Sequence, residues 1–449
     1  MQNTIIQIVV FIIVFGIIVA IHEYGHLFFA KRSGILVREY AIGMGPKIFA
    51  HRGKGGTLYT IRILPVGGYV RMAGWGDDTT EIKKGQSATL SVDAAADMLS
   101  SDEAGKVRQS TLSAAEDENA LSVEPQLIRR INLSEHVELE NAIPIQVTDY
   151  DFEKGLYIEG EVFGERKRFA VDHDATVIEE DGTELRIAPL DVQYQSASVL
   201  GKIITNFGGP LNNFILGLIA FIILTFLQGG VPSNSTVIGE TPKDLPAYQA
   251  GLRTGDKILS INGTEVSNWT ELTSQITGAK TKTLEIDYSR NGVEKTAQLT
   301  PDKQNGSQII GVTTSMKTGF TDKLAGGFTQ TINGMTLIAR ALGNLIAQPD
   351  LNKLGGPVAI FQMTGHATQA GLTGILSFMA LLSINLGIVN LIPIPALDGG
   401  KILINIIEAI RRKPLKPEHE QIVTVAGFVF MVVLMLAVTW NDIMRAFIR

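Results

Sequence analysis

Three residues near the N-terminus, His22, Glu23 and His26, form the pattern H-E-x-x-H. On a helix, residues four positions apart lie about 40° apart around the axis and one turn along it, so both imidazoles face the same side. Two imidazoles at this spacing can bind one zinc ion, and the glutamate between them can take a proton from water. Zinc lowers the pKa of a water molecule that it binds to about 7. The pattern therefore predicts zinc-dependent hydrolysis of a carbonyl compound such as a peptide.

The setting of this pattern is a long apolar run from Ile5 to Ala30. About 20 apolar residues are enough to cross a membrane as a helix. Ionisable side chains inside such a span are costly and therefore mark functional sites. Residues 1–4 carry no lysine or arginine, and the run is longer than the apolar core of a secretory signal. We therefore expect a membrane span rather than a cleaved signal peptide.

A catalytic zinc needs a third protein ligand and an open position. The chain has no cysteine, so the third ligand must be a histidine or a carboxylate. Asp398 closes another apolar run, just after Pro393 and Pro395. These prolines prevent a regular helix, and irregular backbone at membrane depth is tolerated only against protein or a cavity. We predict that Asp398 completes the site; the alternative is that it only caps the loop that follows.

Three further apolar runs, at residues 203–227, 372–394 and 422–440, predict a total of four membrane helices. Basic residues favour the cytoplasmic side of short loops. They gather after the first span and between the third and fourth spans: Lys31, Arg32, Arg38, Lys47, Arg52, Lys54, Lys401, Arg411, Arg412, Lys413 and Lys416. This distribution predicts an N-terminus outside, residues 76–200 inside, and residues 230–370 and the C-terminus outside.

The segment from Asp77 to Asp191 carries 27 acidic and 11 basic residues. With a net charge of −6 for the whole chain, this excess argues against nucleic acid as a partner. Residues 77–124 are rich in Ala, Ser, Asp and Glu, which predicts flexible parts. Short β-like runs then recur at Ile143–Thr148, Gly155–Val162, Arg168–Val171 and Ala175–Ile178. They predict a small, mostly β cytoplasmic domain.

Two shorter β patterns lie elsewhere in the chain. Residues Thr57–Ile63 and Val66–Met72 are expected as two short strands around a turn at Leu64-Pro65. Residues Thr283–Ser289 and Glu294–Thr300 are expected as a second hairpin, because Asn291-Gly292 between them favours a tight turn.

The two zinc motifs together resemble those of the site-2 protease family of intramembrane zinc metalloproteases. The second motif is Asn390-x-x-Pro393-x-Pro395-x-Leu397-Asp398-Gly399. Smaller family landmarks match at residues 42–46, 64–70, 209–213 and 356–358. The bacterial branch that cleaves anti-sigma factors and clears remnant signal peptides is the most similar, in its Gram-positive form. Residues 246–263 resemble a PDZ domain of the protease-associated type.

This resemblance implies a site: zinc ligands His22, His26 and Asp398 for one zinc ion per chain, the catalytic base Glu23, and the substrate-binding residues Asn390, Asn385, Gly67, Gly68 and Tyr69. An amide side chain can donate to and accept from an unwound substrate strand. The hairpin would lie at the membrane beside the site and pair with the substrate by strand addition. As alternatives, the asparagines only join helices, and the hairpin only stabilises the cytoplasmic domain.

The predicted fold is a polytopic α-helical membrane protein with four transmembrane helices, a membrane-associated β-hairpin, a small cytoplasmic β-rich domain and an extracytoplasmic PDZ domain. The expected boundaries are 1–31 (helix 1 with H-E-x-x-H), 32–75 (loop and hairpin), 76–200 (β-rich domain), 201–229 (helix 2), 232–315 (PDZ domain), 316–371 (linker helices), 372–398 (helix 3), 399–420 (cytoplasmic loop) and 421–441 (helix 4). PDZ domains capture peptide C-termini, so this one would admit only substrates whose ectodomain has been trimmed. A purely steric gate is the alternative.

The predicted function is that of an intramembrane zinc endopeptidase in a bacterial plasma membrane. Its partners would be the lipid bilayer and single-span proteins or signal-peptide remnants, already cut by an upstream site-1 protease, but not nucleic acid. Two rivals are a membrane PDZ scaffold with a non-catalytic metal site and a zinc transporter. Glu23 counts against both, because neither metal binding nor transport needs a base beside the ligands.

Overall fold

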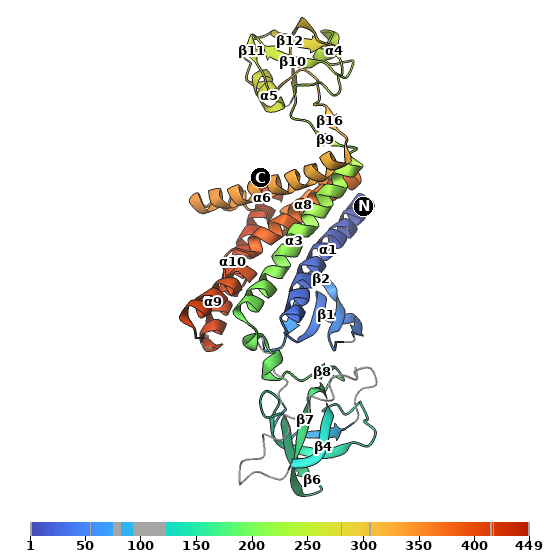
Figure 1. Ribbon diagram of the computed structural model, residues 1–449, viewed down its shortest axis with the longest axis vertical. Helices are drawn as coiled ribbons and strands as arrows, with labels where there is room; N and C mark the ends of the chain where they lie inside the picture. The colour runs from blue at the N-terminus through green and yellow to red at the C-terminus, as the bar shows by residue number, and fades with distance from the viewer. Residues whose placement is uncertain are drawn as a thin grey trace. The chain divides into compact units, whose positions relative to one another are not determined.

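The computed structural model describes residues 2–53, 55–74, 82–92, 123–279, 281–304, 307–413, 415 and 417–447. The chain forms two compact units (Figure 1). One unit comprises Met1–Gly217 and Met335–Arg449, and the other comprises Leu218–Gly334.

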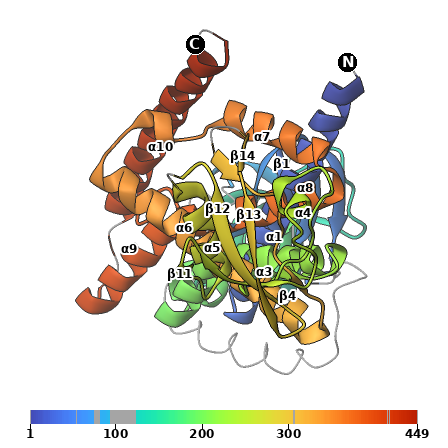
Figure 2. The same cartoon turned by 90° about the horizontal axis from the view of Figure 1, so that it is seen from above.

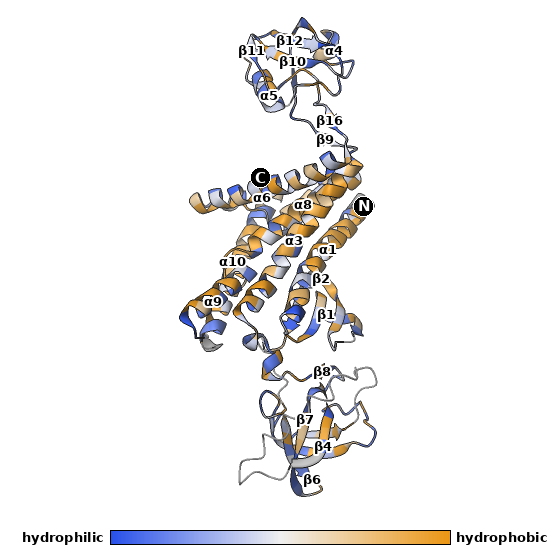
Figure 3. Ribbon diagram, in the orientation of Figure 1, coloured by the Kyte–Doolittle hydropathy of each residue, from blue (hydrophilic) through white to orange (hydrophobic). Residues whose placement is uncertain are grey.

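Four helices are long and apolar enough to cross a membrane: α1 (Gln2–Arg32), α3 (Val199–Leu227), α8 (Gly371–Asn390) and α10 (Pro417–Phe447). Hydrophobic residues follow each of them along its length (Figure 3). Many of these side chains are exposed, among them Ile5 and Phe428. Apolar side chains exposed along a whole helix are stable only in lipid. The prediction of four helices long and apolar enough to cross a membrane is confirmed.

Helices α1 and α3 are in backbone contact where three glycines meet. A Cβ atom on Gly25 would overlap the carbonyl group of Gly208, and a Cβ atom on Gly208 would overlap that of Gly25. A Cβ atom on Gly209 would overlap the ring of His26. Small residues let membrane helices approach this closely. The glycines therefore bring α3 directly against the side of α1 that carries the two histidines.

The third apolar run ends as the prolines predict. Helix α8 ends at Asn390, seven irregular residues follow, and helix α9 (Asp398–Arg411) begins at the predicted zinc ligand. The segment expected as a cytoplasmic loop, residues 399–420, thus contains most of a 14-residue helix. Its apolar residues recur at helical spacing between lysine and arginine, a pattern that the basic residues obscured.

The expected hairpin of residues 57–72 has a different form. A single strand, β2 (Leu58–Met72), spans both predicted strands, and it pairs antiparallel with β1 (Val37–Arg52), which the sequence analysis did not predict. Residues 37–42 of β1 lie between the two halves of β2, because Tyr40 pairs with both Val70 and Tyr59. The strands bend at glycines with positive φ, including Gly43 and Gly67. The pairing is therefore between the consecutive strands β1 and β2, across residues 53–57, and not across Leu64-Pro65.

The acidic segment folds into a small β-barrel, which confirms the predicted β-rich region. Its strands are β3 (Ser87–Ser91), β4 (Val123–Asn132), β5 (Ile143–Asp151), β6 (Tyr157–Val162), β7 (Glu165–Ile178) and β8 (Glu184–Arg186), in the order β4-β3-β5-β6-β7-β8. An additional parallel pairing of β4 with β7 closes the sheet around a core that includes Leu90, Ile128 and Ile158. Strand β7 unites two of the predicted runs. Most of the segment expected to be flexible, residues 77–124, lies outside the described residues.

Two short 3-10 helices, η1 (Leu190–Val192) and η2 (Tyr194–Ser196), connect the barrel to α3. Beyond α6 (Phe320–Ala347) and η3 (Leu351–Lys353), helix α7 (Pro357–Gln369) packs against the N-terminal part of α1 (Figure 2). There the side-chain amide of Gln7 donates to the carbonyl oxygen of Phe361 at 2.7 Å. These contacts hold α1 at its N-terminal end, while the glycine crossing holds it near the histidines.

The second unit contains a small α/β domain. Its main sheet has the order β11-β10-β12-β13, from β10 (Lys257–Ile261), β11 (Thr264–Glu265), β12 (Leu284–Arg290) and β13 (Val293–Leu299). Around it lie α4 (Pro246–Gln249), α5 (Trp269–Gly278), β14 (Asp302–Gln304), β15 (Ser307–Ile309) and a pair of β9 (Val231–Pro232) with β16 (Met316–Lys317). The predicted hairpin of β12 and β13 is confirmed, with φ of 53° at Asn291 and 81° at Gly292.

Candidate metal centre

The structure brings His22, His26 and Asp398 together from α1 and the start of α9. The His22 Nε2 and His26 Nε2 atoms are 3.3 Å apart, and they lie 3.3 and 3.4 Å from Asp398 Oδ2. Tetrahedral zinc with bonds of about 2.0–2.1 Å holds its ligand atoms about 3.3–3.4 Å apart. The spacing of these three atoms therefore matches that of three ligands of one zinc ion, which His22, His26 and Asp398 would hold. Within the described part of the chain, this is the one group of three metal-ligating side chains at such spacing.

The proton positions also favour a cation here. His26 Nδ1 lies 2.8 Å from the carbonyl oxygen of Thr205 on α3, which can only accept, so Nδ1 carries the proton. In the neutral ring, Nε2 then presents a lone pair to Asp398 Oδ2, a buried oxygen without a hydrogen-bond partner. Two lone pairs facing each other in a buried site repel, and a metal ion between them removes the conflict. The residues present thus fit zinc.

His22 is held by the same helix α3. Its Nδ1 lies 3.0 Å from the side-chain amide of Asn213, whose Oδ1 has no partner. With this amide rotated by 180°, Oδ1 accepts the Nδ1 proton and leaves His22 Nε2 for the metal. The main-chain oxygen of Asn213 accepts from Ser383 Oγ at 2.8 Å, which ties α3 to α8. Helix α3 therefore orients both imidazoles through their Nδ1 atoms.

The metal ligands line a pocket of about 310 Å³. Its other walls come from α1, β2, α3, the end of α8, the irregular segment 391–397 and α9: Glu23, Gly68, Tyr69, Val70, Arg71, Met72, Asn206, Asn390, Ala396, Leu397 and Lys401. A Cβ atom on Gly68 would lie 3.0 Å from Glu23 Cγ and 2.9 Å from Val19 Cγ1. Only glycine lets strand β2 come this close to Glu23.

Residues 68–72 of β2 form a continuous wall of this pocket. In the described residues they have one strand partner, β1, with Gly68 opposite Ile42 and Met72 opposite Val37. Tyr69 is locked in place because its hydroxyl donates to Glu39 Oε2 at 2.9 Å. Burial and this buried carboxylate raise the pKa of Tyr69 to about 12, so its hydroxyl stays neutral. An ordered strand thus lies beside the metal ligands.

The structure separates the predicted substrate-binding residues. Asn390, Gly68 and Tyr69 line the pocket, whereas Gly67 does not. Asn385 is exposed on α8 and also lies outside the pocket lining. It stands five positions before Asn390, which is more than one helical turn and places it on another part of the surface.

Sequence reasoning missed three polar residues of the pocket, Arg71, Asn206 and Lys401. Two carried a usable signal, because Arg71 shares a strand face with Tyr69 and Lys401 follows Asp398 by about one helical turn. Asn206 carried none, because only the crossing of α1 and α3 brings it here.

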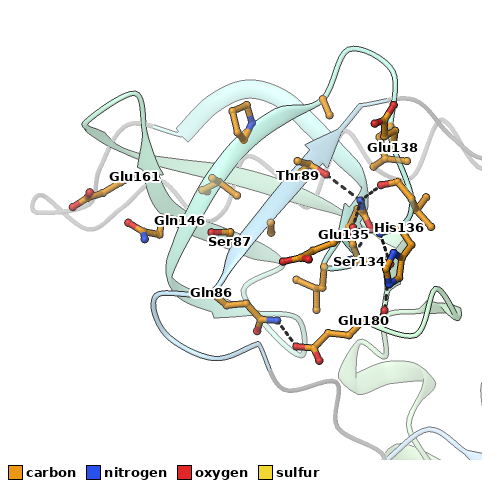
Figure 4. A pocket seen from close by; sticks show the side chains of 18 of the residues that line it. Gln86, Ser87, Thr89, Ser134, Glu135, His136, Glu138, Gln146, Glu161 and Glu180 are labelled. Atoms are coloured by element: carbon orange, nitrogen blue, oxygen red, sulfur yellow. Dashed lines mark hydrogen bonds between the residues drawn. The ribbon is translucent and has the colours of Figure 1, made fainter.

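A larger pocket of about 1170 Å³ lies on the barrel, between β3, β5 and residues 132–142 (Figure 4). Asn132 anchors this loop by donating to the carbonyl oxygen of Val137 at 2.6 Å. Four carboxylates and one imidazole are among the lining groups: Glu135, Glu138, Glu161, Glu180 and His136. They do not form a set with metal-ligand spacing in the described residues. The chemistry therefore belongs to the smaller pocket.

A zinc site of two histidines and an aspartate, with a glutamate beside it and a setting of four apolar helices, defines a membrane metalloprotease. The chain belongs to peptidase family M50, whose family model matches residues 10–434. The matched residues include both zinc motifs, the one with His22 and His26 and the one with Asp398.

Relatives match along the whole chain. A Lactococcus lactis protein named as a zinc metalloprotease is 63% identical over 441 residues, which cover 98% of this chain and 99% of the relative. An Enterococcus faecalis protein named as the protease Eep is 49% identical over 448 residues, with 98% and 99% covered. Among solved structures, the PDZ domain of an SdrC-like protein from Listeria monocytogenes is 24% identical, with a TM-score of 0.17, and the match covers 19% of this chain and 90% of that domain. The protein is thus a zinc metalloprotease, and its four apolar helices and its family make it a membrane protein.

Proposed function

We propose that this protein is an intramembrane endopeptidase that cleaves the membrane segments of single-span proteins and remnant signal peptides. The observation that carries the proposal is the triangle of His22 Nε2, His26 Nε2 and Asp398 Oδ2, with edges of 3.3 to 3.4 Å. Two of these ligands lie on α1, inside the apolar span Thr4–Arg32. Peptide bonds that reach the site are therefore those of membrane segments.

In this mechanism His22, His26 and Asp398 would hold one zinc ion. When bound there, zinc supplies Lewis acidity, which polarises a peptide carbonyl and makes water more acidic. Glu23 accepts a proton from the attacking water and then delivers it to the nitrogen of the leaving amine, so that water is split across the peptide bond. Thr205 and Asn213 keep the two imidazoles oriented throughout.

The substrate must be extended before it can react. A helix keeps its carbonyl groups in internal hydrogen bonds, so a membrane segment has to unwind. Residues 68–72 of β2 line the pocket as an ordered strand and would pair with the unwound segment by strand addition. The side-chain amide of Asn390, which also lines the pocket, would donate to and accept from the substrate backbone. This arrangement would place one peptide bond between Glu23 and the zinc ligands.

The distribution of basic residues supports an orientation with the barrel in the cytoplasm and the small α/β domain outside the plasma membrane. Substrates would then have their N-termini inside. We further propose that residues 232–315 form a PDZ domain that admits substrates trimmed by an upstream site-1 protease, anti-sigma factors among them. A steric gate without peptide binding is the alternative.

The test uses the full chain purified in detergent and a labelled single-span peptide. Cleavage within the apolar segment, stopped both by a zinc chelator and by Glu23→Gln, is the expected result. Cleavage only outside the apolar segment would contradict the intramembrane reaction. A protein that binds zinc but leaves the peptide intact, even when the peptide is already trimmed, would contradict the endopeptidase assignment.

A further inference from the structure

One buried hydroxyl joins three elements behind the metal centre. Tyr194, on η2, is 8% exposed, and its hydroxyl oxygen accepts two hydrogen bonds. One comes from the side-chain amide of Asn206 on α3 at 2.8 Å, and the other from that of Asn405 on α9 at 2.9 Å. Both asparagines are buried, at 1% and 4% exposure. The three side chains thus form a buried polar cluster, in which both asparagine amides donate to the same oxygen.

Each asparagine of this cluster is coupled to a zinc ligand. Asn206 directly follows Thr205, whose carbonyl oxygen holds the Nδ1 proton of His26. Asn405 lies seven positions after Asp398 on α9, which is about two turns along the same face of the helix. A fixed distance between Asn206 and Asn405 therefore fixes the distance between the helix that orients His26 and the helix that carries Asp398.

Helix α9 follows an irregular segment of the chain. The seven residues before it, 391–397, have no regular structure and include two prolines. Leu397 precedes the helix without a side-chain cap. Backbone contacts of Gly399 and Gly400 with the loop bring α9 close, since a Cβ atom on either would overlap a loop carbonyl. The Asn405 bond adds a directional constraint to this packing.

Tyr194 also contacts the end of β2, the strand that lines the pocket. Its main-chain N–H donates to the carbonyl oxygen of Ala73 at 2.8 Å, directly after the end of β2. Its ring belongs to an apolar cluster with Met72 of β2 and with Leu27 and Ala30 of α1. Burial raises the pKa of Tyr194 to about 12, so the hydroxyl stays neutral at the pH of an assay.

We propose that Tyr194 is a positioning residue of the zinc site, whose hydroxyl binds α9 to α3 and thereby sets the separation of Asp398 from His26. The inference rests on the proposed function insofar as these side chains hold zinc. In this proposal the segment between the barrel and α3 does more than connect them, because it also helps to set the geometry of the metal ligands.

The test follows the metal rather than the cleavage reaction. Tyr194→Phe, Asn405→Ala and the double variant are purified as full chains, loaded with zinc, and mixed with an excess of chelator. Loss of a residue behind metal ligands typically weakens metal binding about 10- to 100-fold. We expect each single variant to lose zinc about 10-fold faster than the parent, and the double variant to lose it no faster than the single variants. Cobalt-loaded samples should show a shifted visible spectrum, which a general loss of stability would not produce.

Tyr157→Phe is the matched control. It removes a tyrosine hydroxyl that donates to Asp149 Oδ2 at 3.0 Å within the barrel. Zinc loss and the cobalt spectrum of this variant should equal those of the parent. If Tyr194→Phe does not fold, Asn405→Ala alone decides, because it leaves the Asn206 bond in place.

Three results would overturn the inference. The first is a folded Tyr194→Phe or Asn405→Ala protein with parental zinc loss and cobalt spectrum. The second is additive effects in the double variant, which would show that the two residues act separately. The third is a parent protein that binds no zinc, which would contradict the proposed function as well, whereas the first two leave that function intact.

Discussion

His26 Nδ1 lies 2.8 Å from the carbonyl oxygen of Thr205, and this contact decides the chemistry of the other ring nitrogen. Because a carbonyl oxygen only accepts, the proton stays on Nδ1 and the lone pair of Nε2 faces Asp398. The same bond joins α1 to α3 at the depth of the site. Orientation of a metal-binding histidine by a main-chain carbonyl is a common way to fix its tautomer and its direction.

Replacement of Glu23 by glutamine should stop cleavage and keep the metal. Glutamine has nearly the same shape but cannot accept the proton of water, and general base catalysis typically contributes about 10²- to 10⁴-fold in rate. The measurement is the cleavage rate of a single-span peptide together with the zinc content by elemental analysis. Residual cleavage close to the parental rate would remove Glu23 from its role as base.

Asp398→Ala should release zinc. The substitution removes one corner of the triangle formed with His22 and His26, and two ligands hold zinc much more weakly than three. Zinc per chain, measured after gel filtration, should fall well below that of the parent. Asp191→Asn is the control, because Asp191 is exposed and bonds only His173 among its described side-chain contacts. An unchanged zinc content in Asp398→Ala would exclude Asp398 as a ligand.

Gly68→Ala should slow cleavage and leave zinc binding intact. The new methyl group would lie 3.0 Å from Glu23 Cγ and 2.8 Å from the carbonyl oxygen of Ala41, so the strand or the glutamate must move. A shift of about 1 Å in a reacting group can cost about 100-fold in rate. Gly278→Ala, at the end of α5, is the control, since a Cβ atom there meets nothing within 4 Å. Equal rates for both variants would show that the approach of β2 to Glu23 is unimportant.

Deletion of residues 232–315 should allow cleavage of substrates that still carry their ectodomain. The deletion would remove this filter whether it selects trimmed C-termini or only blocks the path sterically. The measurement compares trimmed and untrimmed forms of one substrate, cleaved by the parent and by the deletion variant. A requirement for trimming that survives the deletion would place the filter elsewhere in the chain.

Peptide binding separates the two forms of this filter. If residues 232–315 bind trimmed C-termini, a peptide with a free C-terminal carboxylate should bind the parent more tightly than the same peptide with an amidated C-terminus. Equal binding of the two peptides would favour a steric gate.

The helical part of the fold follows from local patterns. Four apolar runs predict four helices, and Pro393 and Pro395 predict the break before Asp398, because span length and proline geometry act within a few residues. The β parts depend on which strands pair, and the alternation of residues within one strand does not reveal its partner. Strand β1 was not predicted, since residues 37–52 alternate poorly and become a strand only against β2.

The residues of the candidate metal site were predicted from the sequence alone. The spacing of His22 and His26 places them on one side of a helix. Ionisable side chains within an apolar span are energetically costly, so their presence there indicates a function. The tertiary structure decided how they are held. Backbone contact at Gly25 and Gly208 brings α3 against α1, and only this contact places Thr205 behind His26 and Asn206 within reach of Tyr194. Contacts between residues some 180 positions apart depend on how helices cross, and no local pattern in the chain encodes that geometry.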